Sequence, residues 1–447
     1  MPSYWSAIER RRAARRFISL VTPVALRAQP KPVTLFPVSS ISVDPGAPAA
    51  RPTIAKRHGI ARPSVSPGIV LFALAIGGFA IGTTEFATMS LLQYFAHDLG
   101  IDEPTAGHVI SAYALGVVIG APVIAVLSAR LPRRSLLVAL MTVFALANGL
   151  SAFAPSYHWM LLFRFLSGLP HGAYFGIAAL VAASLVPIEK RTQAVGRVLL
   201  GLTVATIVGV PLANWLGQSV GWRFAFGIVA ALAVSCAVLV FLFVPSEGVD
   251  PAASPLRELG ALRRSQIWLT LATGAIGFGG LFAVYTYLGS TLITVTRVPA
   301  SATPLIFSIF GMGLTAGNLF IPRYADRALM PTAGCLLLWS AAVLALYPIA
   351  TSHYVTVALD VFAVGMGGAL ATVLQTRLMD VAGDSQALAA ALNHSAFNIA
   401  NAIGPWLGGM TIAAGFGFAS TGYVGAGLAL GGLVVWGIAV VSGPAKS

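Results

Sequence analysis

Charged side chains are scarce in this chain of 447 residues: they make up 9% of it, whereas hydrophobic residues make up 57%. Soluble domains carry about 25% charged residues. Too few polar side chains are present to cover a soluble protein of this size, so lipid must be the solvent for much of its surface. The composition excludes an ordinary soluble domain and predicts an integral membrane protein.

Acidic residues are the scarcer charge, since 14 of them stand against 27 lysines and arginines and leave a formal net charge of +13. In a soluble protein such an excess would favour a nucleic-acid partner. In a membrane protein, however, basic residues collect on the cytoplasmic side. No nucleic-acid-binding module is present, so we expect contact with membrane lipids and none with nucleic acid.

Cysteine is nearly absent, and common catalytic motifs are missing altogether. Cys236 and Cys335 both lie in apolar runs, with no Cys/His spacing that would hold a metal. The chain contains no HExxH, no Walker P-loop and no GxSxG elbow. We therefore expect no enzymatic activity, metal or cofactor, and any transport has to draw on an ion gradient.

What the sequence has in abundance is apolar runs of about the 20 residues that a helix needs to cross a bilayer. Each must be helical, because an open backbone in lipid leaves polar groups unpaired. Twelve such spans are predicted, at residues 69–95, 105–127, 135–154, 157–186, 196–219, 223–244, 266–292, 303–322, 332–350, 354–377, 386–413 and 420–442.

The spans fall into two groups of six, separated by a turn-rich linker. We predict a basic cytoplasmic tail at 1–66, helix bundles at 67–245 and 266–442, a linker at 246–265 and a short C-terminus at 443–447. For residues 1–66 four interpretations stay open: a disordered tail, a start codon placed too far upstream, a helix on an anionic membrane surface, or a transit peptide.

Loop charges predict the orientation. With the amino terminus inside, the cytoplasmic gaps carry almost all the loop arginines and lysines, whereas the external gaps hold only Arg223 and Arg297. This pattern predicts that both termini are cytoplasmic, in a bacterial inner membrane.

The two groups of spans resemble each other. Overlaying "RFLSGLPHGA" (164–173) on "DVFAVGMGGA" (360–369) places Arg164 on Asp360, and basic turns follow both span 2 and span 8. Two related six-helix halves are typical of transporters, whose substrate binds near the midplane between them.

Several motifs carry a family resemblance. "GTTEFATMSLL" (82–92) lies in span 1, "RFLSGLPHG" (164–172) in span 4, "GLTVATIVGVPLANWLG" (201–217) in span 5, and "GWR" (221–223) opens span 6. Over residues 68–442 the chain resembles the major facilitator superfamily, and within it the twelve-span drug:proton antiporter group that includes arabinose and sugar efflux permeases. The resemblance implies two six-helix bundles around a central cavity, alternating access, and export in exchange for protons by a functional monomer.

The resemblance also points to residues that change conformation. These are expected in the loop after span 2, in span 5 and in the loop after span 8: Arg130, Arg133 and Arg134; Gly201, Gly209 and Pro211; Asp326 and Arg327. In the first loop Ala129 replaces the acidic residue that is usual in the family. That acidic residue commonly pairs with a helix end or an arginine and so holds one conformation, and this interaction is in doubt here.

Three ionisable residues inside spans are the candidates for proton coupling. Glu85 lies deep in span 1, where removal from water favours a protonated carboxyl group. Arg164 should lie at a similar depth in span 4. We expect Glu85 to alternate between proton and substrate; the alternatives are a permanent Glu85–Arg164 pair, or an Arg164 held by backbone carbonyls. Asp360 is either a second proton site or a structural residue.

Candidate substrate contacts lie in spans 4, 7 and 11. His171 follows Arg164 by two helical turns, and three side chains of span 11 share one helical face. The candidates are His171, Tyr285, Tyr287, His394, Asn398 and Asn401. For each of them, packing between helices is the alternative role.

The sequence as a whole predicts a secondary transporter that exports a sugar or a drug-like compound in exchange for protons. A proton-coupled uptake symporter is the first alternative, because Glu85 would serve both directions. A non-transporting membrane sensor on the same scaffold is the second.

Overall fold

The computed structural model describes residues 66–128, 131–187, 190–246, 262–382 and 386–443, and all regular structure in these ranges is helical. The predicted basic tail, most of the linker, and Arg130 lie outside the described residues. Eleven helical segments are long and apolar enough to cross a membrane. The one predicted span that is not among these eleven is span 11, which corresponds to the 26-residue helix α19. This helix carries His394, Asn398 and Asn401 on one face, called here the polar stripe.

The first group of spans is built from α2 to α10. Its elements are α2 (Pro67–Ser90), α3 (Leu92–Leu99), α4 (Glu103–Leu127), α5 (Arg133–Ala152), α6 (Tyr157–Gly168), α7 (His171–Ser184), α8 (Arg191–Val204), the π-helical η2 (Ala205–Gly209), α9 (Val210–Ser219) and α10 (Trp222–Phe243).

The second group runs from α12 to α20. Its elements are α12 (Ser265–Gly277), α13 (Gly279–Thr294), η4 (Ala300–Ala302), α14 (Thr303–Phe320), α15 (Pro322–Ala325), α16 (Leu329–Ala350), α17 (Tyr354–Met366), η5 (Gly367–Ala369), α18 (Leu370–Ala382), α19 (Gln386–Thr411), η6 (Ile412–Phe416), η7 (Phe418–Ser420) and α20 (Thr421–Val441).

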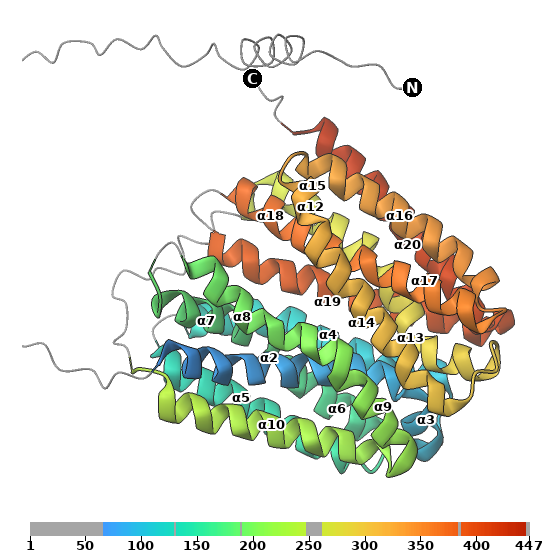
Figure 1. Ribbon diagram of the computed structural model, residues 1–447, viewed down its shortest axis with the longest axis horizontal. Coiled ribbons are helices and arrows are strands. Elements are labelled where there is room, and N and C mark those ends of the chain that lie inside the picture. Colours follow the sequence, from blue (N-terminus) through green and yellow to red (C-terminus); the bar gives the residue numbers. More distant parts are fainter. Residues whose placement is uncertain (1–65, 129–130, 188–189, 247–261, 383–385, 444–447) are drawn as a thin grey trace, which may run out of the picture. The chain divides into compact units, whose positions relative to one another are not determined.

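The two groups form separate bundles that meet along three pairs of helices. The crossings are α4 with α19, α2 with α13, and α14 with η2 and α9. In Figure 1, α19 lies next to α4 and α7. The spans at the centre are the most buried: 72% of an apolar 18-residue stretch of α2 is buried, against 28% of the corresponding stretch in the peripheral span that contains α20.

Local sequence explains where several helices begin and end. The Asp102 side chain accepts a hydrogen bond from the Thr105 amide (2.8 Å) and caps α4. Gly100 closes α3 with φ of +66°, a conformation that glycine adopts without strain. Pro170 lies between α6 and α7 and interrupts span 4.

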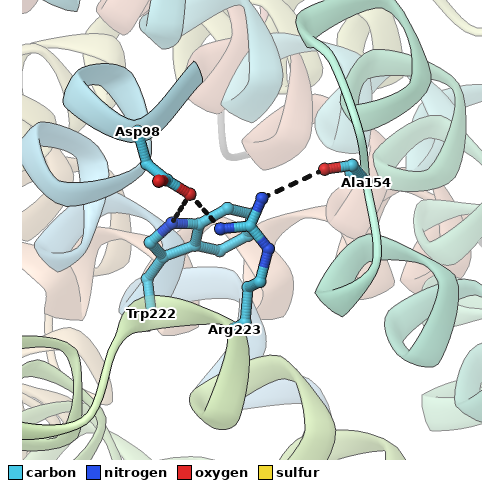
Figure 2. Close-up of polar contacts among 4 residues, drawn as sticks. All are labelled: Asp98, Ala154, Trp222 and Arg223. Atoms are coloured by element: carbon cyan, nitrogen blue, oxygen red, sulfur yellow. Dashed lines mark hydrogen bonds and ion pairs between the residues drawn. The ribbon is translucent and has the colours of Figure 1, made fainter. Parts of the chain in front are cut away.

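At the α3 end of the first bundle, one carboxylate joins three elements (Figure 2). Asp98 accepts a hydrogen bond from the Trp222 indole (3.1 Å) and forms an ion pair with Arg223. Arg223 also donates to the Ala154 carbonyl (3.4 Å). The hydrogen bond from Arg223 lowers the pKa of Asp98 below its ordinary value.

Hydrogen bonds between the bundles gather towards this same end. Glu103 at the start of α4 accepts a hydrogen bond from Ser290 of α13. Gln218 at the end of α9 donates to the Ala300 carbonyl (2.9 Å). Deeper in the protein, Ser111 donates to the Ala402 carbonyl (2.9 Å). Side-chain hydrogen bonds therefore hold the two bundles together at the α3 end.

Closely packed glycines define how the two halves correspond. A Cβ added to Gly168 would lie 2.1 Å from the Tyr113 carbonyl oxygen, where α6 crosses α4. A Cβ added to Gly365 would lie 2.4 Å from the Phe310 carbonyl oxygen, where α17 crosses α14. Both members of the second crossing lie 197 positions after those of the first, so the two crossings are equivalent.

This correspondence corrects the predicted overlay by one residue. It pairs Arg164 with Val361, and Asp360 with Phe163. Arg164 and Val361 are each 1% exposed, as expected of equivalent core positions. Since neighbouring residues on a helix point about 100° apart, Asp360 faces a different direction from Arg164. It is half-buried in the structure.

Candidate functional site

Arg164 is the most unusual buried residue of the first bundle. Its Nη1 donates to Thr84 Oγ1 (3.0 Å) in α2 and approaches Asn148 Oδ1 (3.4 Å) in α5. Thr84 Oγ1 in turn donates to Asn148 Oδ1 (2.7 Å). Ser167, one turn along α6, offers a further acceptor at 3.5 Å. Arg164 therefore joins three helices through neutral side chains.

Aromatic rings complete the surroundings of this guanidinium. Its central carbon lies 4.3 Å from the centre of the Tyr113 ring and 5.5 Å from that of Phe226. Cation–π contacts of this kind stabilise a buried arginine without neutralising it. The positive charge therefore remains available to act on a nearby carboxylate.

Glu85 is that carboxylate, and it lies next to Thr84 in α2. It is 8% exposed, and Arg164 is the charged group that acts on it electrostatically. Among the described residues, Glu85 and Arg164 do not form a direct ion pair. Neither alternative arrangement, a direct Glu85–Arg164 pair or an Arg164 held by backbone carbonyls, is seen. Arg164 is held instead by the side chains of Thr84 and Asn148.

The partner of Glu85 comes from the other bundle. Asn401 Nδ2 in α19 donates to Glu85 Oε1 (3.3 Å). Asn401 Oδ1 is buried and has no hydrogen-bond partner. The carboxylate thus contacts a reorientable amide across the boundary between the two halves.

The polar stripe of α19 reaches the first bundle a second time, at His394. The His394 ring stacks on Phe175 of α7, with centroids 5.6 Å apart and planes at 3°. It also lies 6.2 Å from the ring of His171. His171 Nδ1 is hydrogen-bonded to the Tyr113 hydroxyl (2.9 Å), and Tyr113 is the ring that covers Arg164. The predicted contacts His171, His394 and Asn401 therefore belong to one connected region.

Asn398 lies between these two points on the same stripe. Its amide donates to the His394 carbonyl of its own helix (2.9 Å), while its Oδ1 is buried without a partner.

Aromatic side chains of the second bundle pack on Phe86, the residue that follows Glu85 in α2. The Phe86 ring is 5.5 Å from Tyr285, and Tyr285 is 4.2 Å from Phe310. The Tyr285 hydroxyl is buried without a partner. Tyr287 differs, since its hydroxyl donates to the Pro405 carbonyl (2.9 Å) and fixes α13 to α19. Its position suits packing between helices better than ligand contact.

Asp360 lies apart from this region. Its helix, α17, packs on α14 and α16. Its Oδ2 is buried without a hydrogen-bond partner, and the described group on which it acts electrostatically is Tyr347 of α16. The structure does not bring Asp360 to Glu85, Arg164 or the stripe of α19.

The glycines of the span-5 motif lie where α8 and η2 cross α2 within the first bundle. A Cβ on Gly201 would lie 2.1 Å from the Ala75 carbonyl oxygen, and one on Gly209 would lie 2.3 Å from Thr83 Oγ1. The π-helical turn η2 ends at Gly209, two residues before Pro211. The wider turn accommodates a proline that would otherwise break a regular helix.

The loop residues lie at the other end of the bundles from α3. Arg134 covers the Phe241 ring at 4.7 Å, and Arg133 begins α5. Asp326 and Arg327 follow α15 and are exposed.

The sequence did not single out the residues that hold Arg164. Thr84, Asn148 and Tyr113 were overlooked, although an asparagine inside an apolar span is a recognisable signal of a functional or structural contact.

The sequence profile of the Major Facilitator Superfamily matches residues 74–383. The chain belongs to this superfamily. It is therefore a multi-pass membrane transporter and not an enzyme.

Named relatives fit this assignment. The chain is 39% identical to the inner membrane transport protein YdhP of Escherichia coli K12 over 364 residues, which cover 80% of this chain and 94% of that protein. It is 34% identical to a chloramphenicol resistance protein of Streptomyces lividans (76% and 88% covered). It is 30% identical to a probable sugar efflux transporter of Mannheimia succiniciproducens (80% and 90% covered).

A solved structure shares the fold. A bacterial homologue of the human lysosomal transporter Spinster, described as inward-facing and unoccupied, superposes with a TM-score of 0.62 at 18% identity, covering 85% of this chain and 96% of that one.

Proposed function

We propose that this transporter exports a small molecule in exchange for protons, with Glu85 as the group that alternates between proton and substrate. One observation carries the proposal: the buried carboxylate of Glu85 in α2 contacts Asn401 of α19 in the opposite bundle. A change at Glu85 therefore acts directly on the contact between the two moving halves.

The amide of Asn401 suits both protonation states. An ionised carboxylate only accepts hydrogen bonds, as in the present contact from Nδ2. A protonated Glu85 has a hydrogen to donate, and Asn401 Oδ1 is a buried acceptor without a partner. Rotation of the amide would let it serve either state. The proton thus reverses the direction of the bond, and a substrate donor competes for the ionised form.

Arg164 serves as a positioning residue in this scheme. Its bonds to Thr84 and Asn148 hold a positive charge near Glu85 without neutralising it. That charge limits how far burial disfavours the ionised carboxylate. Glu85 can then release its proton during the transport cycle.

The substrate class follows from the side chains around Phe86, next to Glu85 in α2, and along α19. The second bundle offers aromatic rings and a free Tyr285 hydroxyl, and α19 offers the unpartnered amide oxygens of Asn398 and Asn401. These groups suit a compound with hydrogen-bonding groups and an apolar face. The relatives named for chloramphenicol resistance and sugar efflux fall within this range.

Export is favoured over uptake by the span-5 motif and by those relatives. Gly311 of α14 packs against Thr206 of η2, where a Cβ would lie 2.6 Å from the Thr206 carbonyl oxygen. The motif therefore lies where the bundles must move against each other. Uptake by symport remains the alternative, because Glu85 would serve it equally.

The hydrogen bonds between bundles at the α3 end support an externally closed state. This end is external if both termini lie in the cytoplasm, as the loop charges predict. The related structure described as inward-facing has the same fold. We assign the present conformation as inward-facing, in a bacterial inner membrane.

The test is flux in proteoliposomes under an imposed pH gradient. The panel comprises chloramphenicol, arabinose, other sugars and drug-like cations, with Glu85→Gln as the variant and Asp360→Asn as the matched carboxylate control. We expect gradient-driven movement of a compound in the wild type and in Asp360→Asn, and none in Glu85→Gln. Equal gradient-driven flux in Glu85→Gln would remove Glu85 from the mechanism. Flux in the same direction as the protons would replace antiport by symport.

A further inference from the structure

A cavity at the end of α14 lies outside the region described above. It has a volume of about 330 Å³ and is lined by Phe320, Arg323, Tyr324 and Arg327. Small-molecule sites begin at about this size. The cavity belongs to the second bundle alone, so it is not part of the path between the halves.

The lining residues form one face by their spacing. Arg323, Tyr324 and Arg327 follow Phe320 by three, four and seven positions, which places all four on one side of a helical segment. The Arg323 guanidinium lies 5.9 Å from the centre of the Phe320 ring. Among the described residues neither arginine forms an ion pair, although Asp326 lies between them in the sequence. Two guanidinium groups therefore face the same space with their charges uncompensated by any described acid.

An apolar surface leads to this cavity along α14. Leu305, Met312 and Leu319 are 53%, 44% and 59% exposed, and they recur every seven residues on the helix. The chain changes from exposed apolar to exposed basic side chains within one turn after Leu319. Such a change marks the level of the lipid headgroups.

The equivalent positions of the first bundle carry a different pair of residues. By the correspondence of the two halves, Arg323 pairs with Val126 and Arg327 with Arg130, so only the second half has an arginine at both positions.

We propose that Arg323 and Arg327 bind the phosphate of an anionic phospholipid, whose acyl chains lie along the Leu305–Leu319 face of α14. Guanidinium groups bind phosphate oxygens through paired hydrogen bonds, which makes arginine better suited to this task than lysine. Phe320 and Tyr324 flank the glycerol region of the lipid. The site therefore demands both a phosphate and an apolar chain.

Native mass spectrometry of the full chain, purified in detergent and stripped of lipid, tests the proposal. Phosphatidylglycerol and phosphatidylcholine with identical acyl chains are titrated onto the wild type, Arg323→Gln/Arg327→Gln and Arg323→Lys/Arg327→Lys. The charge-matched control is Arg134→Gln/Arg263→Gln, which removes two positive charges elsewhere. Thermal unfolding of each variant verifies that it is folded.

We expect the wild type to prefer phosphatidylglycerol and Arg323→Gln/Arg327→Gln to bind it roughly thirtyfold more weakly, at about a tenfold change per 1.4 kcal/mol and about 1 kcal/mol per arginine. The lysine variant should fall between the two, and the control should stay near the wild type. An equal loss in the control would show general charge attraction and overturn the site.

Two measurements on the wild type alone also decide the matter, even if the glutamine variant fails to fold. Equal binding of the two lipids would overturn the proposal. Displacement of phosphatidylglycerol by millimolar inorganic phosphate would show a free-phosphate site instead of a lipid site.

Discussion

Arg164 in the first bundle and Val361 in the second occupy equivalent positions, yet one is charged and the other apolar. Both are 1% exposed, and the same glycine-lined helix crossing lies one turn away in each half. The repeat has thus kept the packing of the helices but not the electrostatics of the core. A buried charge with its partners exists only where Thr84, Asn148 and Tyr113 supply them.

The residues that the two glycines contact show the same difference. Tyr113 meets Gly168 and Phe310 meets Gly365, so these two aromatic residues are equivalent. Tyr113 covers the Arg164 guanidinium and bonds to His171, whereas Phe310 packs on the Tyr285 ring at 4.2 Å. One half therefore supplies charge and the other supplies aromatic surface. The Glu85–Asn401 contact joins the two.

The largest expected effect comes from removing the charge that only the first half has. Arg164→Leu leaves the buried oxygens of Thr84 and Asn148 without their cationic donor, and it removes the positive neighbour of Glu85. We expect flux in proteoliposomes to fall by at least about a hundredfold, equivalent to about 2.7 kcal/mol. Asp360→Asn should change flux by less than about threefold. Equal damage from both substitutions would restore Asp360 as a functional counterpart.

The shared packing can be tested by adding one methyl group to each half. Gly168→Ala and Gly365→Ala both push a Cβ into a backbone oxygen of the crossing helix. Overpacking of this kind destabilises by about 1–3 kcal/mol, so both variants should unfold at lower temperature in detergent.

Gly176→Ala and Gly427→Ala are the matched controls, since nothing lies within 4 Å of either added Cβ. They should be neutral or slightly stabilising, because alanine favours helix. If Gly168→Ala lowered the unfolding temperature and Gly365→Ala did not, the two crossings would not be equivalent.

Loss of the Glu85–Asn401 contact between the halves should reduce flux less than loss of Arg164. Asn401→Ala removes the hydrogen bond to Glu85, which is worth about 1.5 kcal/mol when the acceptor is charged, or about tenfold in flux. Asn318→Ala is the control, because this exposed asparagine of α14 donates to the Leu314 carbonyl of its own helix (3.1 Å) and lies outside the region around Glu85. Flux is measured under the same pH gradient, and an equal defect in Asn318→Ala would remove the Glu85–Asn401 contact from the coupling.

The smallest effect is expected at the exposed ion pair of the first bundle. Asp98 and Arg223 are 45% and 42% exposed, so Asp98→Asn should destabilise by no more than about 1 kcal/mol. Since Arg223 lowers the pKa of Asp98, this stabilisation is present above the ordinary aspartate pKa of about 3.9 and is lost as the pH falls through the lowered value.

Thermal unfolding from pH 7 down to pH 3 checks this prediction. The difference between the wild type and Asp98→Asn should shrink on acidification. A difference that grows towards low pH would contradict the assigned role of Arg223.

The sequence by itself determined the helical class, the approximate ends of the spans, and the location of Glu85 and Arg164 inside two of them. These follow from local properties: runs of apolar residues long enough for a bilayer, prolines that interrupt helices, and the rarity of charge in lipid. It also placed His394, Asn398 and Asn401 on one face, because helical periodicity is local.

Only the tertiary structure decided what these side chains meet. The one-residue correction that moves Asp360 away from the position of Arg164 depends on glycine contacts between helices about 50 residues apart in the chain. The choice of Thr84 and Asn148 as partners of Arg164, and of Asn401 as partner of Glu85, depends on how helices rotate against one another. The rotation of each helix about its axis is set by close packing against segments that are distant in the sequence. The residues of one helix alone therefore do not predict which side chains of other helices they contact.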